Sequence, residues 1–285
     1  MMRSPHAFTV AVRKGGKPEA GIALFKQEIK PLGERFPLLK TKIIRGSAAL
    51  FEAMWLGIRA LNFSANEALE EGKDGKKDEI GPLAMAGTMA LALAFSLGLF
   101  LALPLLLTNL LGAQYSALKG NVLFNLTDGA FRVALFLGYV SGISFMKDIR
   151  RVFEYHGAEH KAIAAFEAGV PLTVQNARQY SRIHPRCGTS FLLAVIALSI
   201  LLFSLIPGSW PLWAKGLSRI ILLPVIAGLG YEFIKFSATR CGNPLINALM
   251  MPGLWLQRLT TREPSDDQIE VAIRALDEAV AMEPR

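Results

Sequence analysis

Four stretches of almost unbroken apolar residues constrain this chain more than any other feature of its sequence. They cover residues 83–111, 122–146, 191–206 and 217–236. A helix needs about 20 apolar residues to cross a bilayer, and the buried helices of a soluble core would not supply four such stretches in 285 residues. The sequence therefore predicts a mainly α-helical, polytopic membrane protein with about four transmembrane helices.

The composition agrees with this fold class. Hydrophobic residues make up 52% of the chain and charged residues 19%, whereas soluble domains carry roughly 25% charged residues. The formal net charge of +8 fits basic loops beside anionic lipid headgroups. The basic residues are not interleaved with aromatic residues, which argues against a nucleic-acid partner. We expect membrane lipids to be the surroundings of this chain.

The distribution of basic residues predicts the orientation. The connections near residues 113–121 and 207–216 hold only Lys119 and Lys215, whereas the segment 147–186 is rich in Lys and Arg. Because Lys and Arg gather on the cytoplasmic side, we expect an inner-membrane protein with both termini and this central segment in the cytoplasm. The first 28 residues lack the apolar core of a signal peptide, so no cleavage is expected. The cytoplasmic location would also keep the cysteines reduced.

The segments outside the apolar stretches divide the chain further. FTVAVRK and GIALFKQ, separated by the turn residues GGKPE, predict a β-hairpin. Ser265 with Gln268 predicts a capping box at the start of a C-terminal amphipathic helix. The predicted regions are a hairpin region (1–46), an amphipathic helix with a charged linker (47–80), transmembrane helices 1 and 2 (81–146), a cytoplasmic loop (147–188), transmembrane helices 3 and 4 (189–238) and a cytoplasmic tail (239–285). The amphipathic helix is expected to lie on the membrane surface or to pack on the soluble part.

The cytoplasmic loop holds the residues best suited to chemistry. His156, Glu159 and His160 form the pattern H-x-x-E-H, which is the inverted zincin motif. A spacing of four places both imidazoles on one face of a helix, where they can bind a transition metal, most readily zinc. Glu159 is the candidate general base for a metal-activated water. The alternative is that both histidines simply pack in a helical core.

A catalytic zinc site requires a third protein ligand. His184 and Cys187 lie in H-P-R-C-G-T-S, just before the third apolar stretch, and Glu232 lies within the fourth. A carboxylate inside a membrane segment is a functional candidate by default, although it can also pair with an arginine. We favour His184 as the third ligand, then Glu232. Cys187 is a candidate fourth ligand, a neighbour of the metal or a thiolate nucleophile.

The amino-acid sequences of several segments resemble those of a known family. MMRSPHAFTVAVRK, MKDIRRVFEYHGAEHK, HPRCGTSFLL and PGLWLQRLTTREP are similar to the YqhQ family over nearly the whole chain. This is a bacterial membrane family whose reaction is unknown and whose members are regarded as metal-dependent enzymes. The resemblance points to five positions as functional, namely His156, Glu159, His160, His184 and Cys187.

These observations predict a metal-dependent, hydrolase-like membrane enzyme with a divalent metal site at the cytoplasmic face. Its substrate would be a membrane-associated peptide, a lipid or a lipid-linked metabolite. Two other classes stay open. One is a non-catalytic scaffold or assembly factor with a closed, four-ligand metal site. The other is a small transporter or metal-handling protein, in which Asp128, Arg132 and Glu232 would face one another across the bundle.

Overall fold

The N-terminal part of the chain forms a small antiparallel sheet. The computed structural model describes residues 1–14, 21–30, 32–36, 39, 41–68, 81–185, 187–207, 210–240 and 243–283. Its strands follow the order β1 (Met2–Arg3), β2 (Ala7–Arg13) and β3 (Ile22–Glu28). The pairing of β2 with β3 confirms the predicted hairpin, and β1 adds a third strand. The predicted GGKPE turn, the charged run at 70–79 and Cys241 lie outside the described residues.

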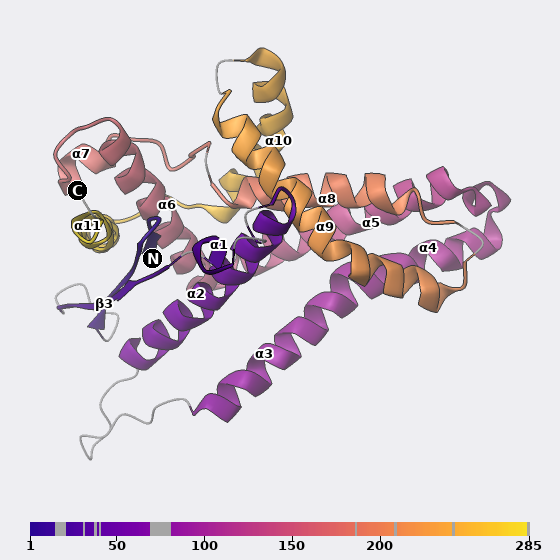
Figure 1. Ribbon diagram of the computed structural model, residues 1–285, viewed down its shortest axis with the longest axis horizontal. Coiled ribbons are helices and arrows are strands. Elements are labelled where there is room, and N and C mark those ends of the chain that lie inside the picture. The colour runs from indigo at the N-terminus through magenta and orange to yellow at the C-terminus, as the bar shows by residue number, and fades with distance from the viewer. Residues whose placement is uncertain are drawn as a thin grey trace.

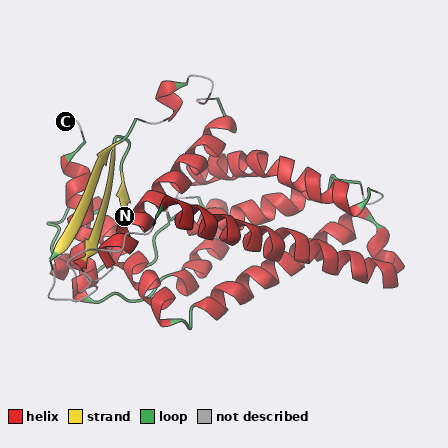
Figure 2. Cartoon of the chain, turned by 90° about the horizontal axis from the view of Figure 1, so that it is seen from below, coloured by secondary structure: helices red, strands yellow, loops and turns green. Residues whose placement is uncertain are grey.

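The sheet is covered by a helix on each face. Successive side chains of a strand point to opposite faces, so Phe8 packs in a buried cluster with α2 (Ile44–Ala68). Thr9 points the other way, and its hydroxyl donates a hydrogen bond to the Ala275 carbonyl of α11 (Asp266–Ala281) at 2.7 Å. The order α2, sheet, α11 therefore builds one layered unit from the two ends of the chain, and both ends lie beside the sheet in Figure 2.

Helix α6 (Lys147–Glu167) packs against α11. The contact is lined on α6 by Ala158, Ala162 and Ala165, all without exposed surface, and small side chains permit a close approach of the two helices. The predicted capping box of α11 is present. These contacts fix α6, which carries the two motif histidines, to the sheet.

The remaining long helices form an extended bundle. Its elements are α3 (Pro82–Leu97), a π-helical segment (Gly98–Ala102), α4 (Leu103–Gln114), α5 (Asn121–Ile143), α8 (Thr189–Phe203), α9 (Leu212–Ala238) and α10 (Pro244–Thr260). Short helical turns are α1 (Leu32–Arg35), a 3-10 turn (Ser116–Lys119) and α7 (Val174–Arg178). Helix α9 contacts both α8 and α2, which joins the bundle to the layered unit.

All four predicted transmembrane stretches are helical, but fewer than four have the length and apolarity of a span. Within the described chain, Leu83–Gln114 and Leu212–Ser237 are long and apolar enough to cross a membrane. A third span results if α5 and α6, which meet at 100°, are counted as one broken element. Helix α8 is shorter: its apolar part is Phe191–Phe203, and the whole helix of 15 residues rises only about 22 Å, against a hydrocarbon core of about 30 Å. The structure thus supports two to three spans by length and composition.

Figure 1 shows these two parts side by side along the long axis of the molecule. We call the part that holds the sheet, α6, α7, α11 and both chain ends the sheet end. The opposite tip of the bundle, where α5 and α9 begin, is called the far end. The predicted amphipathic helix is α2, which joins the sheet end to α9 of the bundle. A Cβ on Gly228 of α9 would come within 2.3 Å of the carbonyl oxygen of Ile43, the residue before α2. Glycine at this position lets α2 start directly on α9.

Candidate metal centre

The two motif histidines meet a cysteine at the sheet end. His156 and His160 lie one turn apart on α6, with ring centroids 4.5 Å apart. Cys187 precedes α8, and its sulfur lies 3.3 Å from Nε2 of His156. One donor atom from each of the three residues lies within 4.8 Å of the others. The structure therefore brings together three of the predicted site residues.

Backbone carbonyl groups orient both imidazole rings. Nδ1 of His156 lies 2.9 Å from the Thr260 carbonyl oxygen at the end of α10, and Nδ1 of His160 lies 2.6 Å from the Arg182 carbonyl oxygen. A carbonyl oxygen only accepts, so Nδ1 carries the proton in each ring. In a neutral ring the lone pair is then on Nε2. A hydrogen bond of this kind at the remote nitrogen is typical of metal-binding histidines, because it fixes the tautomer and the ring direction.

Close backbone packing brings the end of α10 to α6. A Cβ on Gly157, the residue after His156, would lie 2.2 Å from the Arg262 carbonyl oxygen. Only glycine therefore fits at this position. The Arg262 amide donates a hydrogen bond to the Phe153 carbonyl oxygen at 2.9 Å. Together these contacts hold the residues after Thr260 against α6, which explains the glycine in H-G-A-E-H-K.

A second set of contacts holds the loop before Cys187. The buried amide side chain of Gln257 on α10 accepts from the His184 amide at 2.8 Å and donates to the His184 carbonyl oxygen at 2.9 Å. Arg182 donates to the Thr261 hydroxyl at 2.9 Å and to the Thr261 carbonyl oxygen. The loop that carries Cys187 is thus tied to the same helix end that orients His156.

The cluster favours charge separation between sulfur and imidazole. Burial alone raises the pKa of Cys187, but hydrogen bonds with His156, His160 and Thr189 outweigh it and lower this pKa to about 5. Burial lowers the pKa of His156, whereas the hydrogen bond to Cys187 and its charge raise it, and the net direction is upward. A thiolate beside an imidazole is a strong metal donor and also an activated nucleophile.

The other predicted site residues lie outside this three-donor set. His184 is adjacent to His160, with ring centroids 5.8 Å apart, but its Nε2 faces a Glu167 carboxylate oxygen at 3.3 Å. Glu159 pairs with the N-terminal amine of Met1. Glu232 on α9 forms an ion pair with Arg45 at the start of α2, the pairing with an arginine that its sequence position left open.

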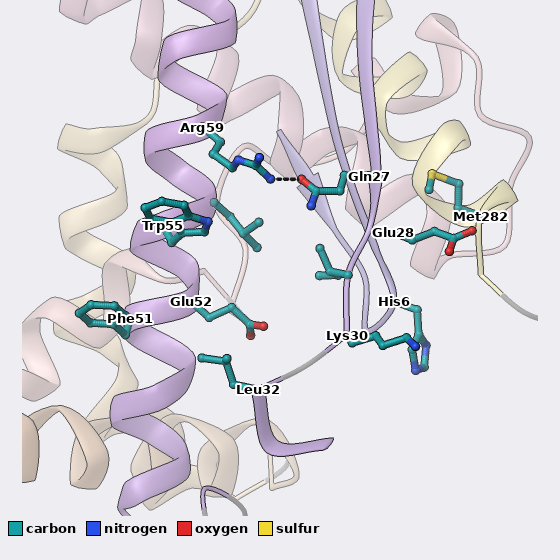
Figure 3. Close-up of a pocket in the computed structure, with 12 residues that line it drawn as sticks. His6, Gln27, Glu28, Lys30, Leu32, Phe51, Glu52, Trp55, Arg59 and Met282 are labelled. Carbon is teal, nitrogen blue, oxygen red and sulfur yellow. Dashed lines mark hydrogen bonds between the residues drawn. The ribbon is translucent and has the colours of Figure 1, made fainter. Parts of the chain in front are cut away.

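Several residues that build the centre were not singled out from the sequence. Thr260 and Arg182 act through their backbone carbonyl groups, which leave no sequence signature. Gln257 and Glu167 are single polar residues in helices, and only the buried position of Gln257 marks it as unusual. The fourth histidine, His6, lines a separate pocket of about 900 Å³ between α2 and β3 (Figure 3).

The fold and the centre together describe a mainly helical protein with membrane-length apolar helices and a His–His–Cys donor set beside them. Residues 41–282 match the family described as "Protein of unknown function (DUF1385)". The chain is 34% identical to the uncharacterized protein YqhQ of Bacillus subtilis (strain 168), over 99% of this chain and 90% of that protein. The chain therefore belongs to the YqhQ family. No solved structure matches it significantly.

Proposed function

We propose that this chain is an inner-membrane protein whose His156, His160 and Cys187 bind one divalent metal ion, zinc by preference, at the cytoplasmic face. The observation that carries the proposal is the convergence of three donor atoms within 4.8 Å, with both histidines anchored at Nδ1. Nitrogen and thiolate donors suit zinc and its neighbours in the transition series. The apolar helices of the bundle support the membrane location.

We further propose that the centre is hydrolytic rather than purely structural. Three protein ligands leave one position of a tetrahedral ion open, which is the arrangement of catalytic zinc, whereas structural sites have four. His184, the nearest candidate fourth ligand, is turned toward Glu167. A bound ion would lower the pKa of a coordinated water, so that hydrolysis can run at neutral pH.

Two carboxylates are candidates for handling the proton of that water. Glu159 is the general base that the motif predicts, and its carboxylate is paired with the N-terminal amine of Met1. Glu167 reaches His184, whose ring lies beside His160. The position of the Glu167–His184 pair favours this pair over Glu159.

Of the substrate classes left open by the sequence, an apolar cleft favours a lipid. A pocket of about 420 Å³, almost entirely apolar, lies among α5, α8, α9 and α10. Its wall includes Leu193 on α8 and Gly253 on α10. Leu193 lies six residues after Cys187, and Gly253 lies seven residues before Thr260 at the end of α10. At the rise of a helix, each separation is about 10 Å. A hydrocarbon chain in the cleft would place a polar headgroup near the metal centre.

The direct test is the metal content of the detergent-purified full-length protein, measured by elemental mass spectrometry after reconstitution with Zn²⁺. We expect about one ion per chain. His156→Ala, His160→Ala and Cys187→Ala should each lose it, while the matched controls His6→Ala and Cys241→Ala should keep it. Absence of bound metal from folded wild-type protein would overturn the metal proposal.

One observation favours a second candidate function. The 3.3 Å separation of His156 Nε2 and Cys187 Sγ, with the Thr260 carbonyl group behind the ring, is also the arrangement of a cysteine nucleophile and its base. Hydrolytic activity that survives complete metal removal but is lost in Cys187→Ser would support this function. Activity lost on metal removal and restored by Zn²⁺ would support the metal centre.

The transporter alternative required Glu232 to face Asp128 and Arg132 across the bundle. Glu232 is paired with Arg45 instead, which gives the transporter alternative no support.

A further inference from the structure

A second polar cluster lies at the far end of the bundle, remote from the metal centre. Asp128 of α5 accepts a hydrogen bond from Arg219 of α9 at 2.8 Å, and the same guanidinium lies 3.2 Å from the side-chain oxygen of Asn125. Arg132, one turn beyond Asp128, approaches the other carboxylate oxygen at 3.2 Å. All four side chains are buried, Asp128 and Arg219 to 99%. Arg219 was not singled out from the sequence, although it lies in the fourth apolar stretch.

The charges in this part of the chain do not balance. Residues 82–146 and 189–231 contain one carboxylate, Asp128, against four cations. Three of these cations, Arg132, Lys215 and Arg219, are at least nine-tenths buried, and the Lys215 ammonium lies over the ring of Phe124 at 4.3 Å. One buried negative charge against three buried positive charges leaves an excess of two positive charges. Lys215 also lies in the first turn of α9, where the peptide dipole adds to the positive potential.

The hydrogen-bond donors of the cluster are also incompletely used. Nε and Nη2 of Arg132 and Nε of Arg219 have no hydrogen-bond partner among the described residues. Nη2 of Arg132 is close enough to Asp128 for ionic attraction but out of line for a hydrogen bond. Both guanidinium groups lie against the ring of Phe203, at 4.8 and 5.1 Å. Excess charge and unpaired donors are costly in an apolar bundle unless a counter-ion supplies what the chain lacks.

We infer that Arg132, Arg219 and Lys215 form a binding site for a phosphate-type oxyanion. Guanidinium groups present planar sets of donors that suit phosphate oxygens. A free phosphate dianion would match the excess of two charges, and the phosphodiester of a lipid headgroup would neutralise one of them. Lys215 lies within the first turn of α9, Asp128 and Arg219 lie about two turns from the starts of α5 and α9, and Arg132 lies about three turns from the start of α5, so a phosphate would reach the cluster from the far end of the bundle. The phosphate could therefore come from an anionic phospholipid headgroup or from a free phosphate.

Thermal unfolding of the detergent-purified full-length protein tests the site. The wild type is titrated in chloride buffer with inorganic phosphate, and separately with short-chain phosphatidylglycerol or phosphatidylcholine. We expect a saturable rise in the unfolding temperature with phosphate, with phosphatidylglycerol, or with both. Arg132→Gln should weaken the apparent affinity by at least about tenfold, since it removes hydrogen bonds to a charged group. Arg274→Gln on α11 is the matched control and should respond like the wild type.

The outcomes separate the two sources of phosphate and can overturn the site. A response to inorganic phosphate indicates a free oxyanion, and a response to phosphatidylglycerol but not phosphatidylcholine indicates a headgroup. Phosphate also stabilises proteins by exclusion from their surface, and a variant without the site would keep only that effect. Because Arg219→Gln could unfold the bundle, Lys215→Met, which breaks no ion pair among the described residues, serves as the second variant. Equal responses of wild type, Arg132→Gln and Lys215→Met, or an equal response to chloride, would overturn the proposal.

Discussion

The sheet end and the far end of this molecule each gather polar residues, but they stabilise them in different ways. At the sheet end, the rings of His156 and His160 are each held by a carbonyl oxygen from another segment, and Cys187 is placed by a loop tied to α10. At the far end, one carboxylate from α5 holds guanidinium groups from α5 and α9, and some of their donors lack partners.

The difference separates a site held by many neutral contacts from one held by a single charge. Loss of one carbonyl contact at the sheet end leaves the other ring and the loop in place. Loss of the Asp128 charge at the far end leaves buried guanidinium groups without their carboxylate. We therefore expect the far end to govern stability and the sheet end to govern chemistry, and the following substitutions test this division.

The largest effect should come from Asp128→Asn. Breaking a buried ion pair by removing one partner costs about 3–5 kcal/mol, because the remaining charge stays buried. We expect the free energy of unfolding, measured by chemical denaturation in detergent, to fall by that amount. Asp148→Asn on the exposed start of α6 is the control and should change stability by no more than about 0.5 kcal/mol. A cost below about 1 kcal/mol for Asp128→Asn would contradict the assignment of stability to the far end.

Gly157→Ala should have the next largest effect and should act on both stability and metal content. The added methyl group would meet the Arg262 carbonyl oxygen and push the end of α10 away from α6. Overpacking of this kind costs about 1–3 kcal/mol, and the displaced Thr260 carbonyl would no longer orient His156. Elemental analysis should show reduced zinc. Gly138→Ala is the control, since its Cβ meets nothing within 4 Å and the helix should become slightly more stable.

The parts of this fold that follow local rules could be predicted from the sequence. The hairpin, the capping box and the helical nature of the apolar stretches depend on residue pattern within a few turns. The number of spans was harder to predict, because α8 is apolar enough but too short, and α5, although 23 residues long, meets the length and composition of a span only together with α6. Arg219 shows a different limit, since its partner Asp128 lies 91 residues away.

The candidate site was predictable to the extent that its residues lie on one helix. A spacing of four brought His156 and His160 together, whereas Cys187 reaches them only through the fold of the loop before α8. Glu159 is offset by about 100° from His160 on the helix, and in the structure it contacts Met1. The Thr260 and Arg182 carbonyl groups belong to the backbone, so no residue type could have pointed to them.

A pH titration can show how strongly the sheet end depends on His156. The protein is used without metal and with Cys241→Ala, so that Cys187 is its one thiol. The ultraviolet absorbance of the Cys187 thiolate should then appear with a midpoint of about pH 5, against an ordinary pKa of 9.0. His156→Gln removes the largest stabilising hydrogen bond, so this midpoint should rise by at least about one unit, or about 1.4 kcal/mol. Equal midpoints in the two proteins would contradict the coupling of His156 to Cys187.

The same shift sets the sign of the pH dependence of stability. Because the pKa of Cys187 is lower in the folded protein, its contribution to stability is complete above about pH 9 and is lost as the pH falls toward 5. His156, whose pKa is raised, contributes in the opposite sense, at low pH, and this contribution is lost as the pH rises through its folded-state pKa. In the metal-free protein, His156→Gln should therefore flatten the pH dependence between about 5 and 9.

The smallest effect should come from Ser265→Ala at the start of α11. The Ser265 side chain accepts from the backbone of Gln268, whose side chain accepts from the Ser265 amide at 2.9 Å and donates to Glu154 of α6 at 3.0 Å. Loss of such a cap costs about 1 kcal/mol, to be measured by denaturation, and Ser265→Thr should restore most of it. Zinc content should stay at the wild-type level, because neither histidine nor Cys187 contacts α11 through this cap. Loss of metal in Ser265→Ala would show that the centre depends on the packing of α11 against α6, and the division between a stabilising far end and a chemical sheet end would then fail.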